Sequence, residues 1–319
     1  MHGASFFSSF LFSMGVTLPN LLILMLGIIL RRIGMIDDRF CEQATKLVFN
    51  ITLPLLLFLS IVNNHVDYAS QALLLGVGIC GTLIMFVLAE CFAAKFIAEK
   101  TERGTFVQSV YRGNNGIIGL ALCINAYGDA VFAPASIYAA GLTLIYNILG
   151  VITLSRSLSD GKVSMGAMLK NIAKNPLIIA IILGLVANAL QLRLVKPLQL
   201  TGGYLAAVTL PLALICAGAS INFRAIGQLS GVSLRSSIGR VLFAPVFMVL
   251  IAKGFGLKGM DMGIVLLMAT TPLAAAAYAM VRAMGGNAVT VANIIGITTI
   301  GSMLASALGL ILLSQIGWL

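Results

Sequence analysis

Long apolar runs separated by short polar connections dominate the pattern along this chain of 319 residues. A helix needs about 20 apolar residues to cross the hydrocarbon core of a bilayer. Runs that fit this length predict ten membrane-spanning helices, near residues 8–30, 42–62, 70–93, 104–126, 130–153, 175–191, 198–221, 236–253, 262–283 and 288–314. Because the connections are too short to hold a separate domain, the expected fold class is an all-α polytopic membrane protein.

Composition agrees with that class and excludes others. Hydrophobic residues make up 60% of the chain and charged residues only 9%, whereas a soluble chain carries about a quarter charged residues. The net charge of +10 comes from basic residues scattered over short connections, without the block or stripe that binds nucleic acid. The five cysteines show no CxxC spacing. We therefore expect lipid around the protein, no nucleic-acid partner, no metal and no cofactor.

The placement of Lys and Arg predicts the orientation, because cytoplasmic loops carry an excess of these residues. Most of them follow the first, third, fifth and seventh predicted spans, and the connections after the second and fourth spans hold none. Both tails also lack Lys and Arg. We therefore expect the odd-numbered connections in the cytoplasm and both termini outside.

The two halves of the chain resemble each other at a fixed offset. "LPNLLILMLGIIL" from Leu18 is similar to "NPLIIAIILGLVA" from Asn175, and "TLPLLLF" from Thr52 is similar to "TLPLALI" from Thr209. Both 175 minus 18 and 209 minus 52 give 157. Because each half holds five predicted spans, an odd number, the second half enters the membrane from the opposite side. Inverted repeats are typical of secondary transporters, whose substrate site lies at the midplane on interrupted helices. The expected repeats are residues 1–157 and 158–319.

The fourth predicted span of each half contains residues that disfavour a continuous helix. These are "RGNNG" (Arg112–Gly116) and "TTP" (Thr270–Pro272). Glycine lowers helix propensity, and proline removes a backbone donor and clashes with the preceding turn. Thr271 before Pro272 fits an N-cap and first helical position, and Asn114 or Asn115 fits the same capping role. We expect an interruption in each span, with a new helix starting inside the membrane.

Two helix N-termini that meet inside the membrane favour an anion, because each carries a partial positive charge and free N–H groups. The helix dipole contributes only up to ~2 kcal/mol, so side chains must add to it. The candidate substrate-binding residues are Arg112, Gly113, Asn114, Asn115, Gly116, Thr270, Thr271 and Pro272. For Arg112 a structural pairing with an acid is the alternative. Tyr138, Tyr146, Asn147 and Asn293 are further polar groups within spans, and either line a cavity or bond neighbouring helices.

The segments "YRGNNGIIGLAL", "KNPLIIAIILGL", "TLPLALICAGASI" and "TTPLAAAAYAMVRAMGGN" resemble the auxin efflux carrier superfamily, over essentially the whole chain. The chain is most similar to the short bacterial members, which lack the long central loop of the plant proteins. This resemblance implies two inverted five-helix repeats with crossing broken helices, as in bile-acid-symporter-like carriers. It also implies a scaffold of spans 1, 2, 6 and 7 that forms a homodimer, and a moving transport domain of spans 3–5 and 8–10.

The resemblance further implies elevator-type transport of malate, malonate or similar organic acids across the bacterial cytoplasmic (inner) membrane. It adds Asn50 and Thr52 on the second span to the candidate site residues. The chain has TTP where the plant proteins carry an asparagine–proline pair, which argues against auxin itself. An auxin-like aromatic acid and Na⁺/H⁺-coupled exchange are the alternatives among transporters, although no pair of acids lies mid-span. Coupling to protons stays unassigned.

Two other classes fit the residues less well. A channel needs a continuous polar pore or a carbonyl filter, and neither pattern occurs. An enzyme needs a catalytic set, but the two histidines are His2 and His65, and no HExxH, P-loop or nucleophile elbow is found. The expected function is therefore transport and not catalysis.

Overall fold

A computed structural model describes residues 18–19, 22–63, 71–159, 174, 176–192, 194–220 and 231–319. Residues 22–32 are helical, and residues 8–17 of the first predicted span lie outside the described residues. The described residues form helices joined by short turns and irregular connections, and the one β-type pairing among them is an isolated bridge between Gly113 and Leu273. The all-α class expected from the sequence is therefore confirmed.

Five helices within the described residues are long and apolar enough to cross a bilayer. They are α4 (Ala72–Phe96), most of α7 (Phe132–Ser157), α10 (Lys196–Ala219), the continuous helix formed by α12 (Gly231–Ile238), η5 (Gly239–Phe243) and α13 (Ala244–Gly254), and α16 (Ala288–Gln315). Two shorter apolar helices are α9 (Pro176–Ala189) and α14 (Gly259–Ala269). The second predicted span is also a continuous helix, made of α2 (Asp38–Leu47), the π-helical turn η1 (Val48–Thr52) and α3 (Leu53–Asn63).

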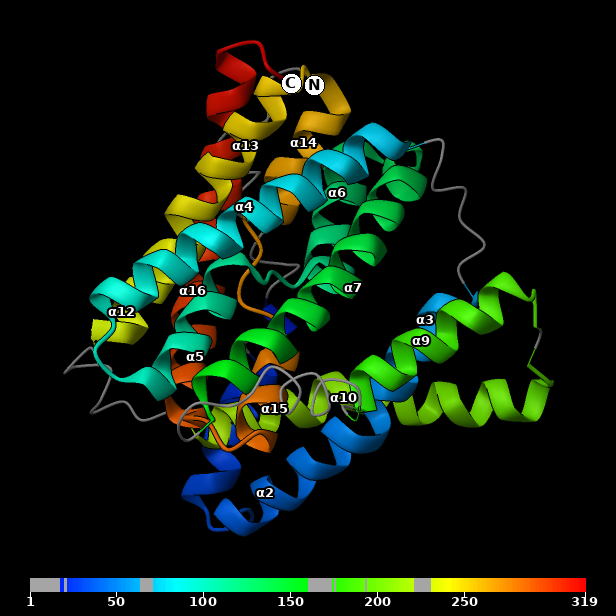
Figure 1. Cartoon of the computed structure of the whole chain (residues 1–319), viewed down its shortest axis with the longest axis vertical. Helices are drawn as coiled ribbons and strands as arrows, with labels where there is room; N and C mark the ends of the chain where they lie inside the picture. The colour runs from blue at the N-terminus through cyan, green and yellow to red at the C-terminus, as the bar shows by residue number, and fades with distance from the viewer. Residues whose placement is uncertain are drawn as a thin grey trace.

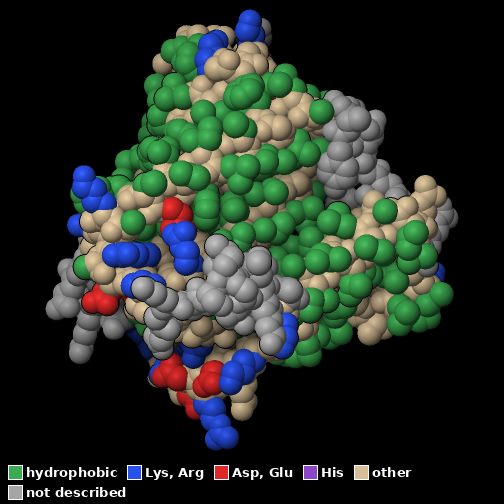
Figure 2. All heavy atoms as spheres, in the orientation of Figure 1, with side chains coloured by type: hydrophobic (Ala, Val, Ile, Leu, Met, Phe, Trp, Pro, Cys, Tyr) green, Lys and Arg blue, Asp and Glu red, His purple; other side chains and the backbone are tan. Residues whose placement is uncertain are grey.

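The outer surface of the protein is apolar over most of the length of these helices. Large side chains such as Leu73, Val87, Leu183, Leu242 and Leu312 are exposed. Figure 2 shows apolar side chains across the face formed by α4 and α7, with acidic and basic side chains gathered mainly at the end where α2 lies. An apolar belt with charged ends is the surface that a bilayer stabilises.

The buried apolar side chains form two clusters. One joins α4, α5 (Lys100–Tyr111), α7, α13 and α14, and includes Leu74, Met85 and Met262. The other joins α3, α9, α10 and α15 (Ala275–Ala283), and includes Leu57, Leu177 and Leu214. In Figure 1 α3, α9 and α10 lie together on one side of the molecule, away from α4 and α12.

Two predicted spans are interrupted. In the fourth, α5 ends at Tyr111 and the π-helical turn η3 (Asn115–Gly119) leads into α6 (Leu120–Tyr127). In the ninth, α14 ends at Ala269 and α15 begins at Ala275. We call residues 112–114 the first break and residues 270–274 the second break.

One detail of the second break differs from the expectation. Thr271 and Pro272 are not the N-cap and first residue of the new helix, because Ala274 precedes α15 in extended geometry. The hydroxyls of Thr270 and Thr271 instead donate to the carbonyls of Leu267 and Met268 one turn back, at 2.9 and 2.7 Å. Both threonines therefore close the end of α14. Pro272 then prevents the helix from continuing.

Candidate functional site

The two breaks lie against each other. The backbone N–H of Asn114 donates to the carbonyl of Pro272 at 3.0 Å, and Gly113 pairs with Leu273 in the antiparallel bridge. The N–H of Leu273 donates in turn to the hydroxyl of Thr298 on α16 at 3.2 Å. Backbone groups left unpaired by the interruptions thus find partners without water, as the interior of a membrane protein requires.

This junction requires glycine at position 113. A Cβ there would lie 2.3 Å from Thr271 Oγ1 and 2.7 Å from Asn115 Oδ1, too close for any other side chain. At Gly116, by contrast, a Cβ would meet nothing within 4 Å. The first glycine of RGNNG therefore permits the contact between the breaks, and the second faces open space.

A cavity of about 400 Å³ lies beside the junction. One wall comes from α3 and α10 and is mainly apolar, with Leu53, Leu57, Leu210 and Ala213 among its residues. The opposite wall comes from the first break, η3 and α7, and includes Arg112, Asn114, Asn115, Tyr146 and Asn147. The cavity is thus apolar on one side and polar on the other.

Two helix N-termini border this cavity. Asn114, Asn115 and Gly116 line it where η3 begins, and residues 274–276 line it where α15 begins. The first N–H groups of a helix have no partner within the helix, and the helix dipole places positive charge there. Both starts therefore contribute positive electrostatic potential to the same space.

Asn115 links the polar groups of the junction. Its side chain is almost fully buried. Nδ2 donates to the hydroxyl of Tyr146 at 3.2 Å, and Oδ1 lies 3.2 Å from the hydroxyl of Thr271. These contacts fix the orientation of the amide at the cavity wall.

Arg112 is the cationic side chain of the described cavity lining. It is buried, and Nη2 donates to Asn147 Oδ1 at 2.7 Å while Nη1 lies 3.0 Å from the sulfur of Met280. Pairing of Arg112 with an acid is therefore not what the structure shows, because its partners are neutral. A buried cation held by neutral groups keeps its charge available for an anion.

The remaining candidates lie away from the cavity lining. Asn50 is exposed, and its Nδ2 donates to the carbonyl of Lys46 in its own helix at 2.8 Å. Thr52 is buried but does not line the cavity. Thr270, Thr271 and Pro272 belong to the second break but do not line the cavity, and Thr271 contacts the lining residue Asn115 through its hydroxyl.

Sequence reasoning missed Arg240 as part of this region. It lies in η5, is 1% exposed, and donates to backbone carbonyls at the ends of both α5 and α14. Arg240 falls inside the eighth predicted span, residues 236–253. An ionisable side chain inside a predicted span was the available signal.

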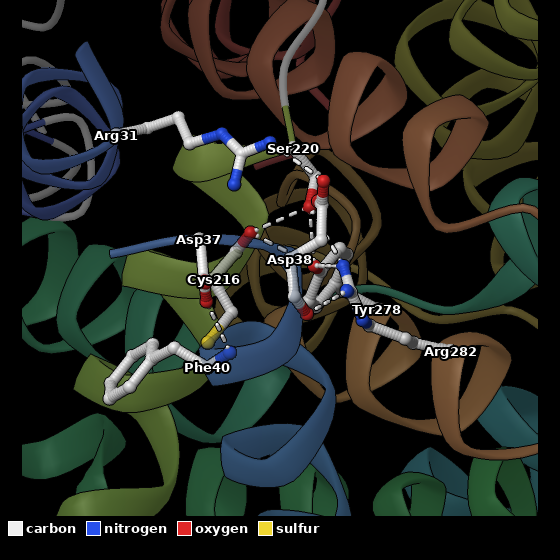
Figure 3. Close-up of polar contacts among 8 residues, drawn as sticks. All are labelled: Arg31, Asp37, Asp38, Phe40, Cys216, Ser220, Tyr278 and Arg282. Carbon is white, nitrogen blue, oxygen red and sulfur yellow. Dashed lines mark hydrogen bonds and ion pairs between the residues drawn. The ribbon is translucent and has the colours of Figure 1, made fainter. Parts of the chain in front are cut away.

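A polar contact also joins α15 to α2 and α10, at the end of the molecule that carries most of the charge. Figure 3 shows Arg282 beside Tyr278, Ser220 and Asp38. Its Nη1 donates to the hydroxyls of Tyr278 at 2.8 Å and Ser220 at 3.1 Å, and Nη2 donates to the carbonyl of Asp38 at 3.0 Å. The helix that begins at the second break is therefore hydrogen-bonded to α2 and to the end of α10, and α10 also contributes to the apolar wall.

A helical membrane protein with a half-polar cavity at two helix breaks has the features of a transport protein. Comparison with known families agrees, because the profile described as membrane transport protein matches residues 12–159 and 162–310. The chain therefore belongs to this family, that of the auxin efflux carriers. The resemblance predicted from the sequence motifs is confirmed at this level.

Two relatives come from archaea. An uncharacterized transporter of Methanothermobacter thermautotrophicus is 25% identical over 272 residues, which cover 83% of this chain and 86% of the relative. An uncharacterized transporter of Methanocaldococcus jannaschii is 25% identical over 315 residues, which cover 94% and 99%. The protein is accordingly an integral membrane protein of a transporter family.

Proposed function

We propose that this protein is a secondary active transporter of small organic anions, mono- or dicarboxylates such as malate or malonate. The observation that carries the proposal is the meeting of two helix N-termini with Arg112 and Asn115 at one cavity of about 400 Å³. A carboxylate placed there accepts hydrogen bonds from free backbone N–H groups and from amide and guanidinium donors. The cavity size suits a small molecule of this class.

The charge of the lining supports an anion over a cation. Within the described residues, Arg112 lines the cavity and neither Asp nor Glu does. A cation bound there would meet a positive side chain and two positive helix ends without a counter-charge, which is costly in a medium of low dielectric constant.

The apolar wall narrows the substrate class further. Leu53, Leu57, Leu210 and Phe132 line the cavity together with the polar residues. A carboxylate with a compact apolar body buries its body against this wall and its charge against the other. We therefore expect monocarboxylates of this shape to bind more tightly than dicarboxylates, and an aromatic acid is the second candidate.

The transport mechanism that we propose is elevator-type alternating access. In this proposal the two halves of the chain are inverted five-helix repeats, the two interrupted helices cross at the breaks, and spans 3–5 and 8–10 move against a dimeric scaffold of spans 1, 2, 6 and 7. The position of the cavity between α3 and α10 on one side and the first break and α7 on the other supports it. In this mechanism the hydrogen bonds from Arg282 to Ser220 and Asp38 break and re-form in each transport cycle.

For orientation we propose the cytoplasmic membrane with the α2 end of the molecule inside. The gathering of Lys and Arg at this end supports the assignment (Figure 2). Both termini then lie outside.

The test is a transport screen in proteoliposomes. Uptake of labelled butyrate, isovalerate, phenylacetate, malonate and malate is measured with and without a pH gradient, together with competition by the unlabelled acids. Saturable uptake of at least one carboxylate, with monocarboxylates competing best, is the expected result. Uptake of none of the panel, or equal competition by organic cations, would contradict the proposal.

A further inference from the structure

Arg240 lies at the junction of the two breaks but is not part of the proposed carboxylate site. It does not line the cavity, and its guanidinium lies on the opposite side of the junction, where α5 and α14 end. Nη1 donates to the carbonyls of Val110 at 3.1 Å and Tyr111 at 3.0 Å. Nε donates to the carbonyl of Thr271 at 2.9 Å, and Nη2 donates to that of Ala269.

These carbonyls are the ones that a helix end leaves unpaired. The last four carbonyls of a helix have no partner within the helix. In α14 the N–H of Thr270 reaches Leu266, the hydroxyls of Thr270 and Thr271 reach Leu267 and Met268, and Arg240 reaches the remaining one. In α5 the last two carbonyls both accept from Arg240. The side chain of Arg240 therefore supplies hydrogen-bond donors to the unpaired carbonyls at the ends of both α5 and α14.

The local sequence brings the guanidinium to this point. Arg240 lies in the π-helical turn η5, a local widening of the helix that often marks functional sites. The preceding Gly239 lets η5 approach α5, since a Cβ there would lie 2.8 Å from Val110 Cγ2. The hydrogen-bond partners of Arg240 are backbone carbonyls. It takes no part in the ion pairs of the described residues, which are Arg31–Asp38, Lys46–Glu42 and Arg156–Glu90.

The charges at the junction can be added up. Each helix C-terminus is equivalent to about half a negative elementary charge and each N-terminus to about half a positive one. Arg112 adds the same charge whether or not Arg240 is present, so it is left out of the comparison, and without Arg240 the two ends and two starts cancel. With Arg240 the two negative ends are neutralised, and the positive starts at Asn115 and Ala275 remain uncompensated beside the cavity.

We propose that Arg240 is a positioning residue of the transport site: a resident cation that closes both half-helices and leaves their junction net positive toward the cavity. Its guanidinium donates to carbonyls of both interrupted helices, Val110 and Tyr111 in one and Ala269 and Thr271 in the other. The proposal rests on the proposed function for its effect on anion binding, but its effect on the junction itself does not depend on any substrate.

The first test is chemical rescue of stability. Arg240→Ala leaves a space lined by carbonyls, which free guanidinium can enter. We expect this variant to unfold at a lower temperature than wild type, and low-millimolar guanidinium to raise that temperature, whereas equal concentrations of NaCl or urea do not. The matched control is Arg235→Ala, because Arg235 lies in the same continuous helix, is exposed, and donates to the carbonyl of Phe96. Wild-type stability of Arg240→Ala, or the absence of a guanidinium-specific gain, would overturn the proposal.

The second test separates charge from hydrogen bonding and applies even if the alanine variant does not fold. Arg240→Gln keeps donors for the carbonyls but has no charge, and Arg240→Lys keeps the charge. We expect carboxylate affinity, measured by competition against the panel above, to fall about tenfold or more in the Gln variant and less in the Lys variant. Equal affinities in the Gln variant and wild type would overturn the role of the charge. If wild type transports none of the panel, the proposed function fails. The rescue of stability by guanidinium still tests whether Arg240 closes the two helix ends, because it does not depend on a substrate.

Discussion

The two breaks interrupt their helices in the same way but contribute different chemistry. The first break and the start of η3 place Arg112, Asn114 and Asn115 at the cavity. The second break offers backbone and the alanines at 274–276, while the hydroxyls of Thr270 and Thr271 turn back onto α14. In the proposed function, polar recognition therefore depends mainly on the first half of the chain, and the second half supplies shape and backbone donors. Substitutions in the two breaks should therefore have unequal effects.

The largest effect is expected for Asn115→Ala. This change removes an amide from the polar wall and leaves the hydroxyl of Tyr146 without its donor. We expect carboxylate uptake to fall by about five- to 150-fold, since a buried polar group without a partner costs about 1–3 kcal/mol. Asn50→Ala is the matched control, because that amide is exposed and bonds only its own helix. Equal uptake by both variants in proteoliposomes would remove Asn115 from the site.

A pair of glycines tests the contact between the breaks. Gly113→Ala forces a Cβ to within 2.3 Å of Thr271 Oγ1, whereas Gly116→Ala meets nothing within 4 Å. We expect the first variant to lose about 1–3 kcal/mol of stability, as overpacked sites do, and the second to stay close to wild type. Thermal unfolding in detergent measures both. A tolerated Gly113→Ala would show that the breaks are not in close contact.

A smaller effect is expected for Thr271→Val, the corresponding change in the second break. It removes one hydroxyl from the oxygen of Asn115 but leaves the cavity lining intact. Uptake should fall by about two- to fivefold, which corresponds to one hydrogen bond of about 0.5–1 kcal/mol. Thr299→Val is the control, since its hydroxyl donates to the carbonyl of Ile295 within α16. A loss larger than that of Asn115→Ala would reverse the comparison between the breaks.

The contact at Arg282 extends the comparison to the helices that follow the breaks. Arg282→Gln removes the hydrogen bonds from α15 to Ser220 and Asp38 and should open this end of the molecule. Cys41 and Cys216 are buried close by, so their labelling by a maleimide should become severalfold faster. Cys123, buried in the other apolar cluster, serves as the internal control. Unchanged labelling of Cys216 would mean that Arg282 does not hold this interface.

The smallest effect concerns acids at the start of the helices that lead into the breaks. Burial raises the pKa of Glu102 from its ordinary 4.5, although hydrogen bonds from Asn287 and Thr290 oppose the shift, and burial raises the pKa of Asp261 from 3.8. The folded state then binds protons more tightly than the unfolded state, so stability increases as pH falls through the raised pKa values and decreases as pH rises through them. Glu102→Gln and Asp261→Asn should each flatten the dependence of the unfolding temperature on pH. An unaltered slope in both variants would contradict this assignment.

The sequence was sufficient for features that depend on local chemistry. Glycine and proline in RGNNG and TTP predicted both interruptions, because their effect on a helix does not need a partner. The N-cap role predicted for Thr271 was wrong, because a threonine beside a helix break can bond the end of the preceding helix as well as the start of the next. Arg240 was missed because its contacts depend on how η5 packs against α5 and α14, which no local pattern specifies. Asn50 came from the family resemblance, and the structure places it in η1, outside the cavity lining. The inverted repeat and the moving domain stay predictions.

In the proposed function the cavity selects negative charge at the two helix starts. The most direct measurement compares the binding of a carboxylic acid with that of its primary amide by titration calorimetry, using isovalerate and isovaleramide with the purified protein. The two ligands share shape and apolar surface but differ in charge. The account predicts that isovalerate binds at least about tenfold more tightly and that Asn115→Ala reduces the difference. Equal affinity for acid and amide would contradict it.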